Sequence, residues 1–217
     1  MEHPLEENLW PDHADILGMD EAGRGPICGP LVVAGVIFEA GYTNDNINDS
    51  KKLSEKKREA LFCQIQQDAK AYWIEFVFER QIDKENIYRA TQNRMDWIAQ
   101  QAQAQYVLTD AMPLNSCSNF EAVVKGDQKS ISIAAASILA KVSRDRYMKV
   151  LDHFYPQYGL AKHKGYPTKA HLQAIGEYGV QDFYRRSYGP VQKVIEQQEL
   201  EKQQEEINDF QQLSLLD

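Results

Sequence analysis

The 217-residue sequence has little cysteine, no long apolar run and almost no positive charge near its ends. Its cysteines, Cys28, Cys63 and Cys117, form an odd set without a CxxC pair or the Cys/His spacing of zinc sites, so neither a disulfide framework nor structural zinc is expected. No apolar stretch is long enough to cross a bilayer. The N-terminus lacks the basic and apolar parts of a signal or transit peptide. We therefore expect reduced thiols, no membrane and a cytoplasmic location.

The net charge of −8 is distributed unevenly. Residues 1–17 contain five acids and no Lys or Arg, and residues 194–217 carry a net charge of −6. The part between them, 18–193, therefore carries about +3. Acids gathered around metal would leave its outer surface more basic still. The charge of this central part is compatible with a phosphate-bearing partner.

The apolar pattern predicts one compact α/β domain with appendages. With 43% hydrophobic and 26% charged residues, the chain has the composition of a globular protein. Strands are expected first, and then strands alternate with helices, which predicts a mixed central β-sheet flanked by helices. Expected strands occupy 16–20, 31–38, 71–79, 106–109 and 120–124, and expected helices occupy 54–69, 83–103, 131–151 and 168–178.

Two adjacent carboxylates, Asp20 and Glu21, end the first expected strand, and the turn Gly23-Arg24-Gly25 follows them. Carboxylate oxygens are the ligands that Mg²⁺ and Mn²⁺ prefer. Glycine lets the main chain approach a ligand closely because it has no Cβ. A single Asp-Glu pair is more often a solvated strand end or an ion-pair partner, so the remaining sequence must decide.

Asp110 and Asp127 also come directly after apolar, strand-like runs. Each alone is compatible with a turn or cap aspartate. Together with Asp20 and Glu21 they would form a cluster that repels itself unless two divalent ions, about 3.5–4 Å apart, bind there as in phosphoryl-transfer nucleases. Asp145 competes for the fourth position, although it lies on an expected helix between two arginines, where a salt bridge is the simpler explanation.

Four longer segments resemble the type 2 ribonuclease H family, ribonuclease HII. They are DEAGRGPICGP, NDSKKLSEKKRE, KGDQKSISIAAASILAKVSRDRYM and YPQYGLAKHKGYPTKAH, and the resemblance extends from about Ile16 to Val191. It implies a ribonuclease H-like fold with a small C-terminal helical extension. It also implies a metal-dependent endonuclease that hydrolyses the RNA strand of RNA–DNA hybrids and cleaves at single ribonucleotides embedded in duplex DNA.

The resemblance assigns the catalytic and metal-binding roles to Asp20, Glu21, Asp110 and Asp127, and thereby selects Asp127 over Asp145. It implies Mn²⁺ or Mg²⁺ in a two-metal site. One cation would generate the attacking hydroxide and the other would stabilise the departing 3′-oxygen, leaving 5′-phosphate and 3′-hydroxyl ends. Asp20 is the best candidate to bridge both cations.

The resemblance also implies that Gly23, Arg24, Gly25 and Tyr166 read the ribose 2′-hydroxyl, the group that distinguishes RNA from DNA. For Tyr166 alone, an aromatic side chain packed on a surface loop would be the ordinary alternative. His163 is expected to line the substrate loop, and its spacing from His171 does not support zinc. Basic side chains are candidate phosphate contacts with salt-dependent affinity, although a solvated basic face is the alternative for each: Lys51, Lys52, Lys125, Lys129, Lys164, Arg185 and Arg186.

These assignments predict four segments: an acidic N-terminal extension (1–15), a catalytic domain (16–155), a substrate-contacting loop and helical part (156–193), and an acidic Gln/Glu-rich tail (194–217). Near the end of the tail, Gln212, Leu213, Leu215 and Leu216 resemble the peptide by which bacterial replication proteins bind the sliding clamp. A frayed apolar end is the alternative. A monomer is the expected oligomeric state.

Two other functional classes remain open at this point. A DNA integrase or Holliday-junction resolvase also gathers carboxylates around two metals, but it has no use for a 2′-hydroxyl reader. A non-catalytic nucleic-acid-binding module is the other alternative. Four acids facing phosphates would weaken its binding, so their presence argues against it.

Overall fold

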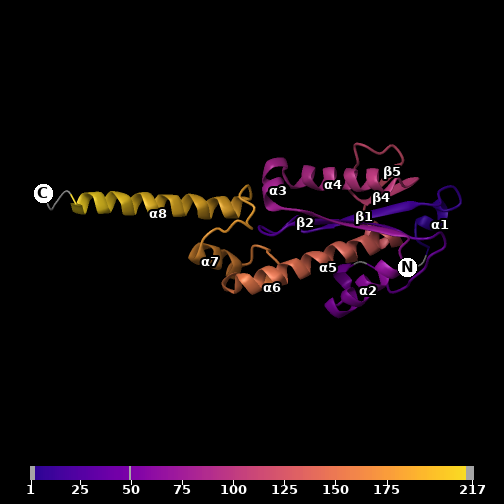
Figure 1. Ribbon diagram of the computed structural model, residues 1–217, viewed down its shortest axis with the longest axis horizontal. Helices are drawn as coiled ribbons and strands as arrows, with labels where there is room; N and C mark the ends of the chain where they lie inside the picture. The colour runs from indigo at the N-terminus through magenta and orange to yellow at the C-terminus, as the bar shows by residue number, and fades with distance from the viewer. Residues whose placement is uncertain (1–2, 49, 214–217) are drawn as a thin grey trace. The chain divides into compact units, whose positions relative to one another are not determined.

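The computed structural model describes residues 3–48 and 50–213. Contacts within the chain define two compact units. The first unit comprises Met1–Arg24 and Pro30–Tyr147, and the second comprises Gly25–Gly29 and Met148–Asp217. Figure 1 labels the helices and strands of both units.

The first unit is built on a five-stranded mixed sheet with the order β3-β2-β1-β4-β5. β1 pairs antiparallel with β2, which pairs antiparallel with β3, whereas β4 runs parallel to both β1 and β5. This confirms the expected mixed sheet. The strands are β1 (Ile16–Ala22), β2 (Leu31–Ile37), β3 (Ala71–Val77), β4 (Tyr106–Asp110) and β5 (Phe120–Val123).

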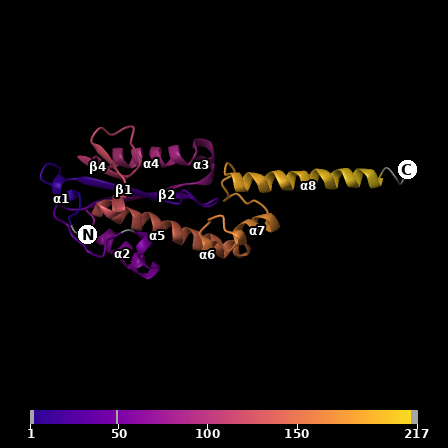
Figure 2. The same ribbon diagram turned by 180° about the vertical axis from the view of Figure 1, so that it is seen from behind.

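Helices cover both faces of this sheet, with α4 (Ile87–Ala102) on one face and α2 (Glu55–Asp68) and α5 (Ile131–Phe154) on the other (Figures 1 and 2). β2 is buried along its whole length, as its unbroken apolar sequence LVVAGVI requires. Its alternate residues Val32, Ala34 and Val36 pack against α2 and α5. On the opposite face, a Cβ at Gly35 would lie 3.0 Å from Ile98 of α4, so glycine lets this helix pack closely.

The expected single helix 83–103 is two helices. α3 (Glu79–Glu85) ends at Asn86, which has a φ of 64°, and α4 begins directly after it. The Asn86 side chain accepts a hydrogen bond from the Arg89 amide at 3.0 Å and so caps α4. Asparagine tolerates positive φ better than most residues, so it can both interrupt and restart a helix.

The acidic N-terminal extension contains a short helix, α1 (Glu6–Leu9), and is packed onto the first unit. Its apolar side chains, Leu5, Leu9 and Trp10, lie against a buried cluster of Ile16, Leu108, Val123 and Ile133. The extension is therefore anchored by apolar contacts that its acidic composition does not reveal.

The second unit is helical, with η3 (Pro156–Tyr158), α6 (Leu160–His163), α7 (Lys169–Tyr178) and α8 (Gly189–Leu213). Thr168 caps α7 by accepting a hydrogen bond from the His171 amide at 3.2 Å. The Gln/Glu-rich tail is helical up to Leu213, and its helix begins five residues before the expected boundary at 194. No helix among the described residues is both long and apolar enough to cross a membrane.

Candidate active site

Asp20 and Asp110 occupy equivalent positions in the register of two neighbouring parallel strands. Gly18 is opposite Leu108 and Met19 is opposite Thr109, so the next position on each strand brings the two aspartates side by side. Side chains alternate along a strand, which puts Asp20 and Asp110 on one face. It is the face covered by α5, because a Cβ at Gly18 would lie 2.4 Å from the backbone nitrogen of Ile133. The structure thus brings together two acids that are 90 residues apart in sequence.

Asp127 reaches the same region through the turn that follows β5. Lys125 has a left-handed φ of 57°, and the short helix η2 (Gly126–Gln128) begins next to it. The Gly126 amide donates a hydrogen bond to Asp110 Oδ1 at 2.8 Å. A Cβ at Gly126 would lie 2.6 Å from the Ile133 side chain, so a larger residue would displace this turn. Asp127 itself is buried, with 3% of its surface exposed.

Asp20, Glu21 and Asp110 affect one another electrostatically. Burial raises the pKa of Asp20 well above its usual range, and the nearby charges of Glu21 and Asp110 raise it further. Burial also raises the pKa of Glu21, against an opposing effect of Arg24 and with a contribution from Asp110. Lys51 Nζ lies 3.9 Å from Asp127 Oδ2. Buried carboxylates of this kind are costly when ionised, and bound cations would remove the cost.

The donor set fits a hard divalent cation. The oxygen Oε2 of Glu21 is buried and, among the residues that the structure describes, has no hydrogen-bond partner. Across 3–48 and 50–213, no three carboxylate, imidazole or thiol groups are close enough to hold one cation together. Like charges repel one another, and bound cations would offset this repulsion. The convergence of the acids on a cation pair stays a prediction.

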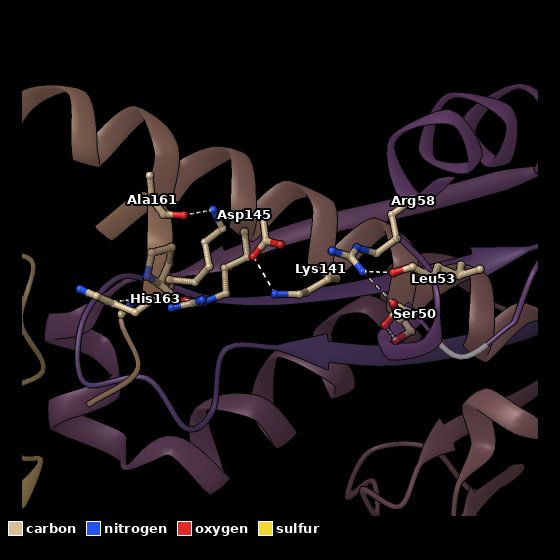
Figure 3. A network of polar contacts seen from close by, with 12 residues as sticks. Ser50, Leu53, Arg58, Lys141, Asp145, Ala161 and His163 are labelled. Carbon is tan, nitrogen blue, oxygen red and sulfur yellow. Dashed lines mark hydrogen bonds and ion pairs between the residues drawn. The ribbon is translucent and has the colours of Figure 1, made fainter. Parts of the chain in front are cut away.

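A polar network fixes the short helix η1 (Ser50–Lys52), and its contacts with Arg58 are drawn in Figure 3. Ser50, at the start of η1, is 2.9 Å from the hydroxyl of Ser137 on α5, and Ser137 also bonds the Asp20 carboxylate. Arg58 of α2 donates to the Ser50 carbonyl at 3.0 Å. The Lys51 side chain remains 79% exposed, as a phosphate contact requires.

Asp145 forms an ion pair with Lys141, which lies one helical turn earlier in α5. Lys141 Nζ lies 2.7 Å from Asp145 Oδ1 (Figure 3), so the salt bridge involves this lysine. The neighbouring Arg144 is buried and donates to the Pro30 carbonyl at 2.9 Å. A Cβ at Gly23, which has a φ of 104°, would lie 2.2 Å from Arg144 Nε. Arg144 therefore fixes the path of the Gly23 turn, a role that the sequence analysis did not assign.

In the second unit, the Tyr166 ring packs against the backbone of Gly25. A Cβ at Gly25 would lie 3.2 Å from Tyr166 Cε1, and Tyr166 is 48% exposed. The Ile27 amide donates to the Gly165 carbonyl at 2.9 Å, which ties the two segments together. The structure thus brings together Gly25 and Tyr166, two of the predicted recognition residues, and leaves the tyrosine accessible.

Arg185 corrects the prediction of a phosphate contact. Its side chain is fully buried. The guanidinium donates to the Pro26 carbonyl at 2.8 Å and, through two nitrogens, to the Gly29 carbonyl at 3.0 and 2.8 Å. A buried guanidinium that binds backbone carbonyls is shielded from a duplex. Arg185 instead fixes the segment Gly25–Gly29.

The remaining basic candidates differ in exposure. Lys164 is half-buried and donates to the Ala161 carbonyl. Arg186 is exposed and lies 3.8 Å from Asp182. The exposed side chains of Lys52, Lys125 and Lys129 remain predicted phosphate contacts.

His171 is buried at the centre of the second unit, and its ring stacks on His163 with centroids 4.1 Å apart. Its Nδ1 is 2.9 Å from the Tyr166 carbonyl, which can only accept, so Nδ1 carries the proton. Nε2, 2.9 Å from the Tyr184 hydroxyl, then accepts from it. Burial lowers the pKa of His171 to about 4. A neutral His171 therefore holds the backbone of Tyr166.

This histidine predicts a loss of stability in acid. Because its pKa is about 4 in the folded state and about 6.5 when unfolded, the unfolded chain binds more protons below pH 6.5. From pH 7.5 to 4.5 we expect this group to remove about 2–3 kcal/mol of unfolding free energy. Urea unfolding of wild type and His171→Gln at both pH values measures it. An equal pH dependence in both proteins would contradict the assignment.

Comparison with known proteins identifies the family. The model of the ribonuclease HII family matches residues 17–191. The chain belongs to the ribonuclease HII family. The ribonuclease HII of Francisella tularensis subsp. tularensis (strain WY96-3418) is 54% identical over 183 residues, which cover 83% of this chain and 98% of that protein. The resemblance inferred from the sequence motifs is thereby confirmed, and the chain is a member of a family of hydrolytic endonucleases that act on the RNA strand of RNA–DNA hybrids.

Solved structures confirm the predicted ribonuclease H-like fold. The crystal structure of ribonuclease H2 from Pyrococcus horikoshii OT3 superimposes with a TM-score of 0.75 at 26% identity, covering 84% of this chain and 98% of that one. Ribonuclease HII from Archaeoglobus fulgidus, solved in a complex with PCNA, gives a TM-score of 0.70 at 25% identity, covering 80% and 95% of the two chains.

Some residues that support this ribonuclease HII site had weak sequence signals. Ser137 stands in the run of small apolar residues of α5, and a hydroxyl on that face was the available hint. Glu6, which is buried against the start of α5, lies in the acidic extension, where nothing in the sequence distinguishes it from its neighbours. Of the predicted clamp-binding residues, Gln212 and Leu213 end α8, and Leu215 and Leu216 lie outside the described residues.

Proposed function

We propose that this chain cleaves duplexes at single embedded ribonucleotides as well as hydrolysing the RNA strand of RNA–DNA hybrids. Membership of the ribonuclease HII family supports hybrid hydrolysis. The catalytic assignment rests on one observation: Asp20 and Asp110 occupy equivalent positions on neighbouring parallel strands. The hydrogen bond from the amide of Gly126, the residue before Asp127, to Asp110 supports the inclusion of Asp127 in the site.

In this proposal Asp20, Glu21, Asp110 and Asp127 hold two divalent cations, Mn²⁺ or Mg²⁺. When bound, these cations supply Lewis acidity for the attacking water and for the departing 3′-oxygen, so that 5′-phosphate and 3′-hydroxyl ends result. The protein contributes fixed positions. The Gly126 amide orients Asp110, and the Glu21 amide donates to Asp20 Oδ1 at 2.7 Å. Lys51 adds positive charge beside Asp127, where the scissile phosphate would approach.

Recognition of the ribose rests on the turn Gly23-Arg24-Gly25 and on Tyr166. A Cβ at Gly23 would collide with Arg144, so this position takes no side chain, and Gly25 is exposed to solvent, where a sugar-phosphate chain can approach its backbone. The exposed phenol of Tyr166 supplies a hydroxyl that can hydrogen-bond the 2′-hydroxyl. The resemblance to the family assigns these roles, and the packing of Gly25 against Tyr166 supports them.

The direct test is cleavage of end-labelled duplexes mapped to the nucleotide. One duplex carries a single ribonucleotide, one is an RNA–DNA hybrid and one is all DNA, each with Mn²⁺, Mg²⁺ or EDTA. We expect metal-dependent cutting of the first two only. An all-DNA four-way junction is the fourth substrate, and cutting of this junction instead would favour a resolvase. Duplex binding without turnover in either metal would favour a non-catalytic binding module.

We further propose that the C-terminal peptide binds a bacterial sliding clamp. Gln212, Leu213, Leu215 and Leu216 provide the motif, and the Archaeoglobus fulgidus relative was solved in a complex with PCNA. A tether of this kind raises the local enzyme concentration at DNA. Deleting 212–217 is expected to weaken clamp binding at least about tenfold in a calorimetric titration. The control Ile207→Ala, an exposed position on α8, should bind as the wild type does. Equal affinity of the deletion and the full chain would contradict the proposal.

A further inference from the structure

Glu6 is a fully buried acid in the N-terminal extension, outside the 17–191 that match the family. Its carboxylate reaches the first turn of α5. Oε2 accepts from the Ile131 amide at 3.3 Å, and Oε1 accepts from the Ser132 amide at 2.9 Å. The Ser130 hydroxyl also donates to Oε1 at 2.5 Å. Both carboxylate oxygens of Glu6 thus accept hydrogen bonds from the N-terminus of α5.

These contacts complete the cap of α5. The Ser130 hydroxyl accepts from the Ile133 amide at 3.1 Å, as a serine cap does. In the usual capping box, a glutamate within the same helix completes the arrangement. Here the carboxylate comes from a residue 124 positions earlier in the chain. Its negative charge at the N-terminal end of the helix is also favourable for the helix dipole.

The same helix start is packed directly against the candidate metal site. The Ile133 side chain occupies the place that a Cβ at Gly126 would take, and Gly126 precedes Asp127. The backbone of Ser132 and Ile133 occupies the corresponding place at Gly18, two residues before Asp20. The Leu5 amide donates to the Lys129 carbonyl at 2.8 Å, two residues after Asp127. The extension therefore holds both the loop that carries Asp127 and the helix that supports the loop. Because the start of α5 lies directly against both glycines, we expect a shift of this helix start to displace both acids.

We propose that Glu6 is a positioning residue for cation binding, which sets the Asp127 loop through the first turn of α5. The inference rests on the proposed function, because it assumes that Asp127 holds a cation. It extends the functional machinery to a segment outside the family match. The inference assigns no such role to the neighbouring Glu7, which is exposed and whose carboxylate lies 3.1 Å from His3.

The test compares Glu6→Gln with the matched control Glu7→Gln on the same short helix. Mn²⁺ affinity is measured by electron paramagnetic resonance, and kcat and KM are measured over a Mn²⁺ series. We expect Glu6→Gln to bind Mn²⁺ about tenfold more weakly, in line with losses of residues that orient metal ligands. Its kcat should fall at limiting Mn²⁺ and recover as Mn²⁺ increases, with KM for the hybrid unchanged. Glu7→Gln should behave as the wild type does.

A merely structural cap would lower the melting temperature of Glu6→Gln and leave its Mn²⁺ affinity unchanged, and that result overturns the inference. If Glu6→Gln does not fold, Ser130→Ala decides. It removes one of the three contacts to Glu6 and also the Ser130 cap of Ile133, both in the first turn of α5, so weaker Mn²⁺ binding supports the inference and unchanged binding overturns it. Wild-type protein that neither binds Mn²⁺ nor cleaves would instead overturn the proposed function, and the inference with it.

Discussion

Replacing Asp20 with asparagine is expected to lower the rate of RNA–DNA hybrid cleavage at least about 10³-fold, with hybrid affinity within a few-fold of wild type. Asp20 is the most central of the four acids. It is hydrogen-bonded to the Glu21 amide and Ser137, and it is level with Asp110. Asparagine keeps the size of the side chain and removes the negative charge that a cation pair needs. Single-turnover cleavage with saturating enzyme measures the chemical step separately from binding.

The stability of this variant provides the control for folding. The raised pKa of Asp20 means that the folded metal-free chain binds more protons than the unfolded chain, from pH 3.8 up to the raised value. Stability is therefore lost as pH rises through this window, and the ionised carboxylate opposes folding above it. In EDTA at pH 8, Asp20→Asn should therefore melt above the wild type. A variant that melts lower, or that cleaves at near-normal rate, would contradict the role of Asp20.

A second acid serves as the matched comparison. Asp145 is also buried, but its carboxylate is occupied by Lys141. Asp145→Asn should cleave within a few-fold of the wild-type rate wherever the protein is folded. A loss as large as that of Asp20→Asn would return Asp145 to the list of candidate metal ligands.

Tyr166→Phe is expected to reduce kcat/KM for a duplex with one ribonucleotide about 10²-fold. The ring contacts Gly25 through its carbon atoms, so phenylalanine preserves the packing and removes only the hydroxyl. The 2′-hydroxyl would then lose a hydrogen bond that distinguishes RNA from DNA, and an unpaired polar group in a site is costly. Cleavage mapped on one labelled duplex measures both rate and position.

Tyr178→Phe is the control for this substitution, because Tyr178 is a tyrosine of the same unit with similar exposure, on α7. It should cleave as the wild type does. Wild-type rate and position for Tyr166→Phe would remove Tyr166 from the recognition site and leave the Gly23-Arg24-Gly25 turn as the reader of the ribose.

The sequence predicted the strands of the sheet well because their apolar runs are long and bounded by turn residues. It ended β1 at Asp20, whereas β1 continues through Glu21 and Ala22, which pair with Val33 and Val32 of β2. Carboxylates normally indicate a strand end, since burying them is costly. Two acids inside a paired strand contradict the usual strand composition, and such exceptions are expected at functional sites such as metal sites.

Long-range contacts limited the rest of the prediction. Arg185 stands in a basic-aromatic segment with a typical surface composition, yet its carbonyl partner Gly29 is 156 positions earlier. Glu6 similarly finds its partners on α5. Local patterns carry no information about such distant partners.

The break between α3 and α4 is a local feature. Apolar spacing continues across Asn86, and only the positive φ at this residue reveals that the helix ends and a new one begins.

The segment Gly25–Gly29 belongs to the second unit although both of its flanks belong to the first. A chain shortened to end at Tyr147 would keep these five residues but lose the guanidinium of Arg185 that binds the Pro26 and Gly29 carbonyls. Neither unit can therefore be cloned as one uninterrupted stretch with its own hydrogen bonds intact. Protein engineering that swaps the C-terminal part between relatives has to transfer this pentapeptide together with it.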